Sequence, residues 1–431
     1  MKIIECPPRD RWESLLRRPV KTVADIEETV LRVFNAVRAE GDQAIRGFTR
    51  EFDGVTLDDF GLTDEEIREA SANVAPALRQ AIGQARSNIE KFHSAQRSDK
   101  VQVETMPGVS CWQEKRPIEK VGLYIPGGSA PLFSTILMLA VPAAIAGCRE
   151  VVLCSPPDKE GKLHPAIIDT AAQCGIRNIY KVGGIQAIAA MTFGTAGIPK
   201  VYKIFGPGNQ YVTVAKQLAT AYDVAIDMPA GPSELLIAAD ESANPAFVAA
   251  DLLSQAEHGP DSQVILVSTS TGLLNKVSEE VQRQMRYLPR ADLATRAMAH
   301  SRFICVPDDE TAVELVNAYA PEHYIICCER ESYYLEHIRN AGSVFVGNFT
   351  PVSAGDYASG TNHTLPTNGY ARQYSGVNLD SFMKSITFQK ITAHGIRDLG
   401  PAIETMAEEE GLLAHKNSVR VRLDALKAGS N

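Results

Sequence analysis

The sequence predicts an α/β fold with two doubly wound, incomplete Rossmann-like domains. Short apolar runs, such as VGLYIPGG at 121–128 and EVVLCSPP at 150–157, alternate with helical patterns along most of the 431 residues. Such alternation is typical of mostly parallel sheets that carry helices on both faces. A helical region at 22–98 precedes the alternation, and an amphipathic helical tail at 381–431 follows it. We expect this tail to pack on a partner subunit.

The helical region before the first strand contains two runs. In TVADIEETVLRVFNAVRAE, apolar residues recur at three- and four-residue spacing, as on one face of a helix. The second run begins at Thr63 and has Glu66 three residues later, which is the pattern of a capping box. Residues 101–117 then change to a strand-like composition.

The strand–helix alternation falls into two sets, which predicts two sheets in separate domains. The predicted parts are an N-terminal extension (1–24), a first α/β domain from 25–120 and 234–380, a second α/β domain (121–233) and the tail (381–431). The first domain carries the candidate metal-binding and acid–base residues, and the second carries the glycine-bearing turns.

The composition argues against a nucleic-acid-binding or membrane-spanning protein. Hydrophobic residues make up 45% and charged residues 22%, and the formal net charge is -9, which does not suit an anionic partner. The N-terminal segment has no apolar core of signal-peptide length. We therefore expect a soluble, cytoplasmic protein. None of the eight cysteines forms a CxxC pair, which favours reduced, mostly buried thiols.

A loop rich in small residues, 342–363, is the first stretch that could carry chemistry. It follows a short apolar strand and presents Asp356 and His363 within eight residues. A carboxylate and an imidazole on such a loop suit a metal ion or a polar substrate. The structural alternative is a surface turn stabilised by an Asx hydrogen bond.

Three further stretches place imidazoles beside polar donors. Gln255 and His258 are three residues apart at a predicted helix end, so they share one face. Glu322 and His323 fall between a helix and a strand, where they could supply two bases. The tail carries Glu410 and His415 in EEEGLLAH. Each stretch alone is also compatible with a solvated helix face or a surface turn.

These residues together could form a metal site. Two imidazoles and oxygen donors suit Zn²⁺ or a similar divalent ion. The candidates are Gln255, His258, Asp356 and either His415 or His363. Their spacing does not decide which four bind.

Three glycine-bearing turns, IPGGSAP (125–131), VGGIQ (182–186) and FGPGNQY (205–211), each follow a strand and precede a helix. Backbone N–H groups at such helix starts can hold a pyrophosphate. None of the turns completes G-x-G-x-x-G with an acidic residue about twenty residues later. As a nucleotide fingerprint they are weak, which would suit a cofactor that exchanges.

Nine stretches of the chain, between about residue 25 and about residue 425, resemble the histidinol dehydrogenase family. They are YIPGGSAPLFSTILMLAVPA, VGGIQAIAA, KIFGPGNQYVTVAK, DMPAGPSELLIAAD, LLSQAEH, APEHY, GDYASGTNHTLPT, YARQYSG and EEGLLAHKNSV. Their length and order make the resemblance highly specific.

The resemblance implies oxidation of L-histidinol to L-histidine through the aldehyde, with two NAD⁺ and one water. It also implies a homodimer in which the tail of one subunit completes the other's site. The implied zinc ligands are Gln255, His258, Asp356 and His415. The implied acid–base residues are Glu322 and His323. The implied substrate-binding residues are Ser233, His323, His363, Glu410 and the four zinc ligands. The implied NAD contacts are Tyr124, Gln186 and Asn209.

The residues suit this chemistry. His323 could take the alcohol proton as hydride leaves, and Glu322 could deprotonate the water that the second oxidation needs. Zinc would then mainly orient the substrate. Two other readings use the same residues: a zinc hydrolase, which would show no nucleotide dependence, and a non-catalytic binding protein descended from such an enzyme.

Overall fold

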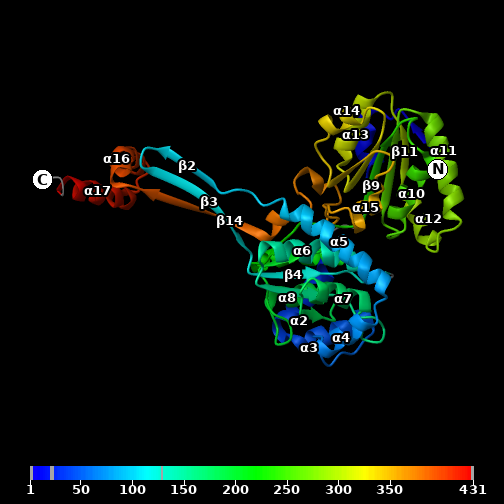
Figure 1. Cartoon of the computed structure of the whole chain (residues 1–431), viewed down its shortest axis with the longest axis horizontal. Coiled ribbons are helices and arrows are strands. Elements are labelled where there is room, and N and C mark those ends of the chain that lie inside the picture. Colours follow the sequence, from blue (N-terminus) through cyan, green and yellow to red (C-terminus); the bar gives the residue numbers. More distant parts are fainter. Residues whose placement is uncertain (1–2, 20–23, 128–129, 429–431) are drawn as a thin grey trace. The chain divides into compact units, whose positions relative to one another are not determined.

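The computed structural model describes residues 3–19, 24–127 and 130–428 (Figure 1). The predicted start of the helical region at 22–23 and two residues of the first glycine-bearing turn lie outside these ranges. The chain forms two compact units: Met1–Gln96 with Ile118–Phe382, and Arg97–Pro117 with Met383–Asn431. Among the described helices, none is long and apolar enough to cross a membrane.

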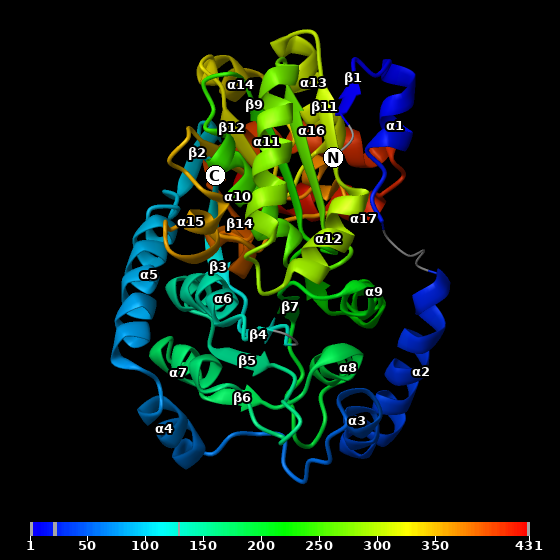
Figure 2. The same cartoon turned by 90° about the vertical axis from the view of Figure 1, so that its right-hand side faces the viewer.

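The first unit contains a five-stranded parallel sheet in the order β6-β5-β4-β7-β8. The strands are β4 (Lys120–Tyr124), β5 (Glu150–Cys154), β6 (Asn178–Tyr180), β7 (Lys203–Phe205) and β8 (Ala225–Ile226). Its crossover helices are α6 (Phe133–Ala146), α7 (Pro165–Gln173), α8 (Gly184–Phe193) and α9 (Gln210–Ala219). Figure 2 shows α6 and α7 on one face and α8 and α9 on the other. The strand order reverses between β4 and β7, and such switch points commonly bind ligands.

A six-stranded parallel sheet has the order β1-β11-β10-β9-β12-β13. The strands are β1 (Ile3–Glu5), β9 (Glu234–Ala239), β10 (Gln263–Ser268), β11 (Arg302–Cys305), β12 (His323–Cys327) and β13 (Ser343–Val346). The helices in this part are α1 (Trp12–Leu15), α10 (Pro245–Ala256), α11 (Thr271–Met285), α12 (Ala291–His300), α13 (Asp309–Tyr319), α14 (Glu331–His337) and α15 (Val352–Tyr357). The central strand β9 is buried throughout, as expected for a sheet covered on both faces.

The N-terminal helices pack on the five-stranded part. They are α2 (Ala24–Glu40), α3 (Asp42–Phe48), the π-helical turn η2 (Thr49–Asp53), α4 (Asp64–Ala72) and α5 (Pro76–Ser94). Helix α2 contacts α8 and α9, α4 contacts α7, and α5 contacts α6. Residues 25–120 are predicted to belong with 234–380, but the apolar face of α2 joins the core beneath α8 and α9 instead. The predicted division into domains as a whole stays a prediction.

Two local features of the sequence have different outcomes. The capping box is confirmed: Glu66 N–H donates to Thr63 Oγ1, and Thr63 N–H donates to Glu66 Oε2. The N-terminal extension, in contrast, is not separate from the sheets. Its residues Ile3–Glu5 form an edge strand that pairs with β11.

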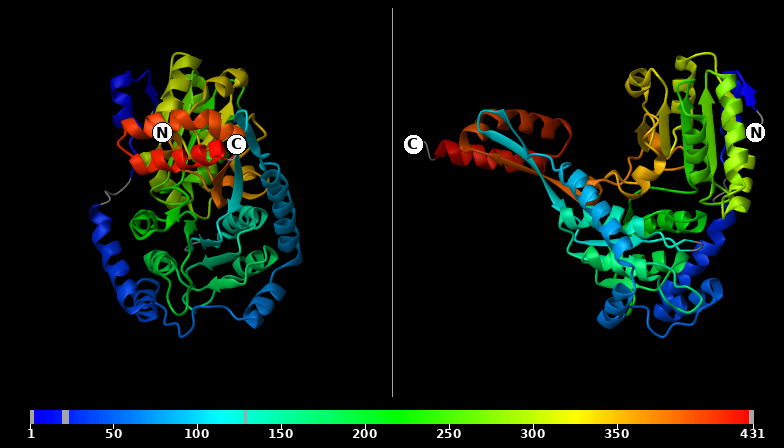
Figure 3. Two further views of the ribbon diagram at one scale, coloured as in Figure 1. Left: turned by 90° about the vertical axis from the view of Figure 1, so that its left-hand side faces the viewer. Right: turned by 45° about the vertical axis from the view of Figure 1, so that its right-hand side comes forward.

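The second unit joins two segments that are far apart in sequence. Strands β2 (Val101–Met106), β3 (Val109–Pro117) and β14 (Met383–Ile391) form an antiparallel sheet in the order β14-β3-β2. Helices α16 (Ala393–Glu409) and α17 (Leu413–Ala428) pack on each other in the same unit (Figure 3). The tail therefore contains a strand that pairs with β3, and β2 pairs with the other edge of β3.

Candidate active site

Glu322 and His323 lie side by side at the start of β12, and both are buried, at 6% and 3% exposure. The neighbouring strand β9 begins at Glu234, whose backbone holds both side chains. Its N–H donates to Glu322 Oε2 at 2.8 Å, and its C=O lies 3.2 Å from His323 Nδ1. Because a carbonyl only accepts, Nδ1 carries the proton and Nε2 is left to act as a base.

The surroundings of His323 favour proton uptake. Burial alone disfavours the imidazolium, but the carboxylates of Glu322 and Asp356 raise the pKa of His323 well above its ordinary value. His323 Nε2 lies 3.3 Å from Asp356 Oδ1. Glu322 and Asp356 therefore stabilise the protonated form of the His323 ring from its two sides.

Asp356 brings the candidate metal donors together. It lies in α15 near its C-terminal end, and Gln255 lies near the C-terminal end of α10. Gln255 is fully buried; its Nε2 donates to Asp356 Oδ2 at 3.3 Å, while its Oε1 is buried without a hydrogen-bond partner. Burial opposes ionisation of Asp356, but His323, His363 and His258 hold its pKa below the ordinary value.

These donors fit a zinc ion. Gln255 Oε1 has no partner, Asp356 is ionised, and His258 is exposed and close enough to lower the pKa of Asp356. A buried acceptor that lacks a donor is costly unless a ligand satisfies it. The three residues supply one ligand fewer than a tetrahedral zinc site needs. Within the described ranges, no three or more His, Cys, Asp or Glu residues form a group that could hold a metal ion by themselves.

His363 is engaged by its own surroundings. Its Nδ1 lies 2.7 Å from the carbonyl oxygen of Asp356 and therefore donates, and its Nε2 lies 3.2 Å from Thr135 Oγ1. Burial lowers its pKa, so the ring is neutral at pH 7. The sequence leaves His363 and His415 as alternatives for the fourth metal ligand. Both ring nitrogens of His363 already have hydrogen-bond partners.

The remaining predicted site residues lie in different places. Ser233 immediately precedes Glu234, so it lies at the same edge of the sheet. Glu410 is the C-cap residue that follows α16 and His415 lies in α17, and both are exposed within the second unit. The first unit therefore brings together Gln255, Glu322, His323, Asp356 and His363, while Glu410 and His415 belong to the second unit.

Glu322 and His323, the predicted acid–base pair, lie at the amino end of the strands. Glu322 and His323 fall between helix and strand as predicted, but sites in open parallel sheets usually lie at the carboxyl ends. Helices α10 and α15 explain the difference. Each returns antiparallel to the strands, so its C-terminal end, with Gln255 or Asp356, comes back to the amino edge.

A cavity of about 810 Å³ lies at the carboxyl end of the five-stranded sheet. Its lining includes all three predicted NAD contacts, Tyr124, Gln186 and Asn209. Tyr124 ends β4 and its hydroxyl accepts from Gly184 N–H; burial raises its pKa to about 12, so the hydroxyl stays neutral. Asn209 caps α9 by accepting from Val212 N–H at 3.1 Å. Both residues flank the switch point between β4 and β7.

A buried ion pair fixes the turn that carries Asn209. Gly206 has a φ of +124°, and a Cβ there would lie 2.0 Å from the carbonyl oxygen of Tyr124, so only glycine fits. Gly206 N–H donates to Asp227 Oδ2 at 2.8 Å, and Lys216 Nζ donates to Gly206 C=O at 2.8 Å. Lys216 and Asp227 also pair with each other at 2.5 Å.

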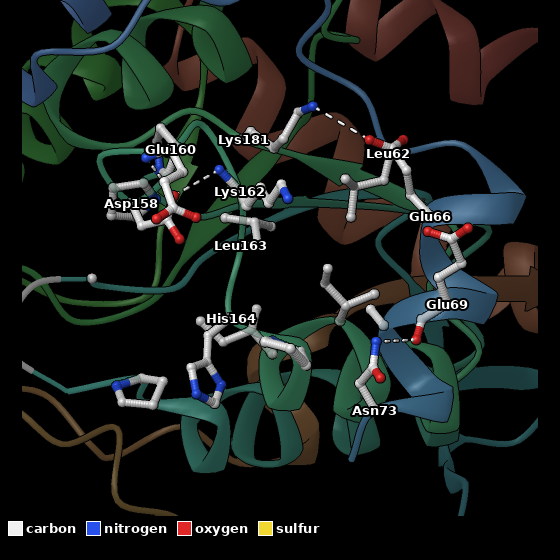
Figure 4. A pocket seen from close by; sticks show the side chains of 18 of the residues that line it. Leu62, Glu66, Glu69, Asn73, Asp158, Glu160, Lys162, Leu163, His164 and Lys181 are labelled. Atoms are coloured by element: carbon white, nitrogen blue, oxygen red, sulfur yellow. Dashed lines mark hydrogen bonds and ion pairs between the residues drawn. The ribbon is translucent and has the colours of Figure 1, made fainter.

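A second cavity of about 550 Å³ shares the loop at 156–158 with the first (Figure 4). Lys181 Nζ lies 3.6 Å from Glu66 Oε1 across it, and Asp158 accepts from the backbone N–H groups of Glu160 and Lys162. Because none of the predicted NAD contacts lines this cavity, the larger cavity is the candidate cofactor site.

The sequence did not indicate Asp53 and Phe52, which line the larger cavity from η2. They precede the first strand of the sheet by more than sixty residues, so no strand–turn–helix motif includes them. A capping or turn pattern around them would not have found them either, because only the packing of η2 brings them to the cavity.

Comparison with known proteins agrees with the resemblance seen in the sequence. The family model for histidinol dehydrogenase matches residues 16–423. Histidinol dehydrogenase from Bacteroides thetaiotaomicron is 59% identical over 99% of this chain and 100% of its own length. The enzyme from Xylella fastidiosa is 51% identical over 98% and 99%. A crystal structure of histidinol dehydrogenase from Elizabethkingia anophelis, 56% identical, superposes with a TM-score of 0.96 over 99% of each chain. The chain belongs to the histidinol dehydrogenase family.

Proposed function

We propose that this chain oxidises L-histidinol to L-histidine through L-histidinaldehyde, the final steps of histidine biosynthesis, with two NAD⁺ and one water. Family membership supports the activity. The observation that supports the mechanism is the pair of hydrogen bonds by which the backbone of Glu234 orients the side chains of Glu322 and His323. A hydrolase needs no dinucleotide, and so does not require a cavity at the switch point. The relatives do not support that alternative.

In the first oxidation, His323 is the base. Its Nε2 takes the hydroxyl proton of the alcohol while the carbinol carbon transfers hydride to NAD⁺, which leaves the aldehyde, NADH and a protonated imidazole. The hydrogen bond from Nδ1 to Glu234 C=O keeps the ring in the required tautomer and orientation. The carboxylates of Glu322 and Asp356, which raise the pKa of His323, stabilise the imidazolium that this step forms.

In the second oxidation, Glu322 activates water. Its carboxylate takes one proton as the water oxygen bonds to the aldehyde carbon, and the protonated His323 returns its proton to the aldehyde oxygen, which gives the hydrated aldehyde. The hydrate then gives hydride to a second NAD⁺ and a hydroxyl proton to the now neutral His323, leaving the carboxylic acid. A cysteine nucleophile is not needed: burial raises the pKa of Cys148 to about 11 and that of Cys327 to about 12, so these thiols stay protonated.

We further propose that Gln255 Oε1, His258, Asp356 and the partner subunit's His415 hold one Zn²⁺. Two observations support this set: Gln255 Oε1 has no hydrogen-bond partner, and both ring nitrogens of His363 already have one. The bound metal would supply a template for the imidazole and amine of histidinol. Ser233, His363 and Glu410 would complete the substrate pocket.

A homodimer with crossing tails would explain the second unit. Apolar side chains on it are exposed within one chain, including Val101 (61%), Met406 (66%) and Leu413 (64%). Exposed apolar surface of this kind is typical of a protein interface. The tail residues Glu410 and His415 are exposed as well, and are thus available to a partner.

Subunit complementation tests this arrangement. His415→Ala removes a ligand from the tail, and Glu322→Gln removes the group that activates water from the first unit, so neither variant alone should form L-histidine, which is the activity measured here. If the tails cross, a mixed dimer has one intact site, and an equal mixture after reassortment should recover about a quarter of the wild-type activity. If each tail serves its own chain, no mixed dimer has an intact site, and the mixture stays inactive. Mixing each variant with itself is the control.

A further inference from the structure

The cofactor cavity contains an acidic side chain that no cation neutralises among the described residues. Asp53 Oδ2 accepts one hydrogen bond, from Gln186 Nε2 at 3.1 Å. The other acid of the lining, Asp158, differs because its Oδ1 accepts from two backbone N–H groups of its own turn. Asp53 therefore has acceptor positions left for a ligand with hydroxyl donors.

A second observation also indicates a ligand beside Asp53. Gln186 is fully buried, and its Oε1 has no hydrogen-bond partner, although its Nε2 is bonded to Asp53. That Oε1 lies next to Gly184, which is another residue of the lining. Buried acceptors rarely stay unpaired. Asp53 and Gln186 thus form a pair of acceptors on one wall of the cavity.

The neighbouring wall suits a purine. Phe52, adjacent to Asp53, is 44% exposed, and Tyr211 is 36% exposed; both line the cavity. Two cations also line the cavity: Lys159, on the loop with Asp158, and Arg32, whose guanidinium is bonded to Glu51 and lies 5.9 Å from the centre of the Phe52 ring. The exposed faces of aromatic side chains can stack on a base. An arginine that is already bonded to a glutamate offers little to an additional phosphate.

We propose that Asp53 binds the adenosine ribose of the dinucleotide and makes the enzyme select NAD⁺ over NADP⁺. The 2′- and 3′-hydroxyls donate to the carboxylate, and a 2′-phosphate would be repelled by it. In common dinucleotide folds, an acid about twenty residues after the glycine motif has this role. Here the sheet has no such acid in its own motif, and η2, which precedes the sheet, supplies it. This inference rests on the proposed function, because it takes NAD⁺ as the cofactor.

The test measures ligand binding and not activity alone. ADP-ribose and its 2′-phosphate are titrated into wild-type protein and into Asp53→Asn by calorimetry. Asparagine keeps the acceptor for Gln186 but removes the charge. Wild type should bind ADP-ribose about 100-fold more tightly than the 2′-phosphate. In the variant, binding of ADP-ribose should weaken about 10-fold and the discrimination should shrink to about 10-fold or less.

Two further variants make the result decisive. Asp53→Ser removes the charge and leaves room for a phosphate, so it should lower the discrimination at least as much, and it covers the case in which the asparagine variant folds poorly. Asp59→Asn removes one exposed acid close by in sequence and should leave both affinities unchanged. Unchanged discrimination in both Asp53 variants, or an equal loss in Asp59→Asn, would overturn the proposal.

Steady-state kinetics separate this inference from the proposed function. The ratio of kcat/KM for NAD⁺ to that for NADP⁺ should fall at least about 10-fold in Asp53→Asn, mainly through KM for NAD⁺. If wild type oxidises histidinol with NAD⁺ but the ratio does not change, only the role of Asp53 is wrong. If wild type forms no NADH from histidinol, the proposed function itself fails.

Discussion

Replacing Glu322 by glutamine should separate the two oxidations. The side chain is buried and accepts one hydrogen bond from Glu234 N–H, and the amide oxygen of glutamine can accept the same bond. The variant therefore keeps its shape but cannot take a proton from water. Loss of a general base costs about 10²- to 10⁴-fold, or about 3–5 kcal/mol in the activation barrier. This cost should fall on oxidation of the aldehyde.

The assay is a single turnover with excess NAD⁺, in which NADH absorbance is followed and free aldehyde is trapped with hydroxylamine. The first NADH should form within about 10-fold of the wild-type rate, because Asp356 remains beside His323 Nε2 although the charge of Glu322 is lost, while the second should be slowed about 100-fold or more and the trap should collect aldehyde. Glu329→Gln, an exposed change just after β12, is the matched control and should behave like wild type. Equal slowing of both steps, or no slowing of either, would refute the role given to Glu322.

Three other perturbations follow from buried groups. Lys216→Met leaves Asp227 as an unpaired buried charge, so the free energy of unfolding in urea should drop by about 3–5 kcal/mol and KM for NAD⁺ should rise; unchanged values would contradict the positioning of the turn. Iodoacetamide at neutral pH should leave activity intact, because burial raises the pKa of Cys174 and Cys328 to about 12; rapid inactivation would bring back a cysteine nucleophile. Burial raises the pKa of Asp53 from 3.8 to about 6, so the folded state takes up its proton first as the pH falls. Wild type should therefore gain about 1–2 kcal/mol of stability relative to Asp53→Asn between about pH 7 and about pH 4, as measured by urea unfolding at both pH values; a constant difference would mean that this pKa is not raised.

Patterns that are local in sequence were predictable. The capping box at Thr63 needs only two residues three apart, and the structure forms it. The mixed α/β class with parallel sheets follows from repeated apolar runs and helical patterns, and the structure confirms it. The three residues matched to NAD contacts also line one cavity, because each follows or ends a strand of the same sheet.

Features that depend on distant segments were not predictable from pattern alone. Ile3–Glu5 is too short to be recognised as a strand, and it forms only because Arg302–Cys305 offers a parallel edge. Periodicity predicts which face of a helix or strand a residue lies on, but not which edge of a sheet it reaches. Gln255 and Asp356 meet only because α10 and α15 both run antiparallel to the strands and end at the same edge. Asp53 reaches the cavity through the packing of a helical turn that carries no nucleotide motif.

The most direct test of the account is the number of NADH molecules formed per L-histidinol consumed by the purified protein, together with identification of the product. The account predicts two NADH per substrate and L-histidine as product, with activity lost on chelation and restored by zinc. One NADH with release of the aldehyde would contradict the second oxidation and the role of Glu322 in it. No NADH from a zinc-loaded protein would contradict the dehydrogenase activity itself.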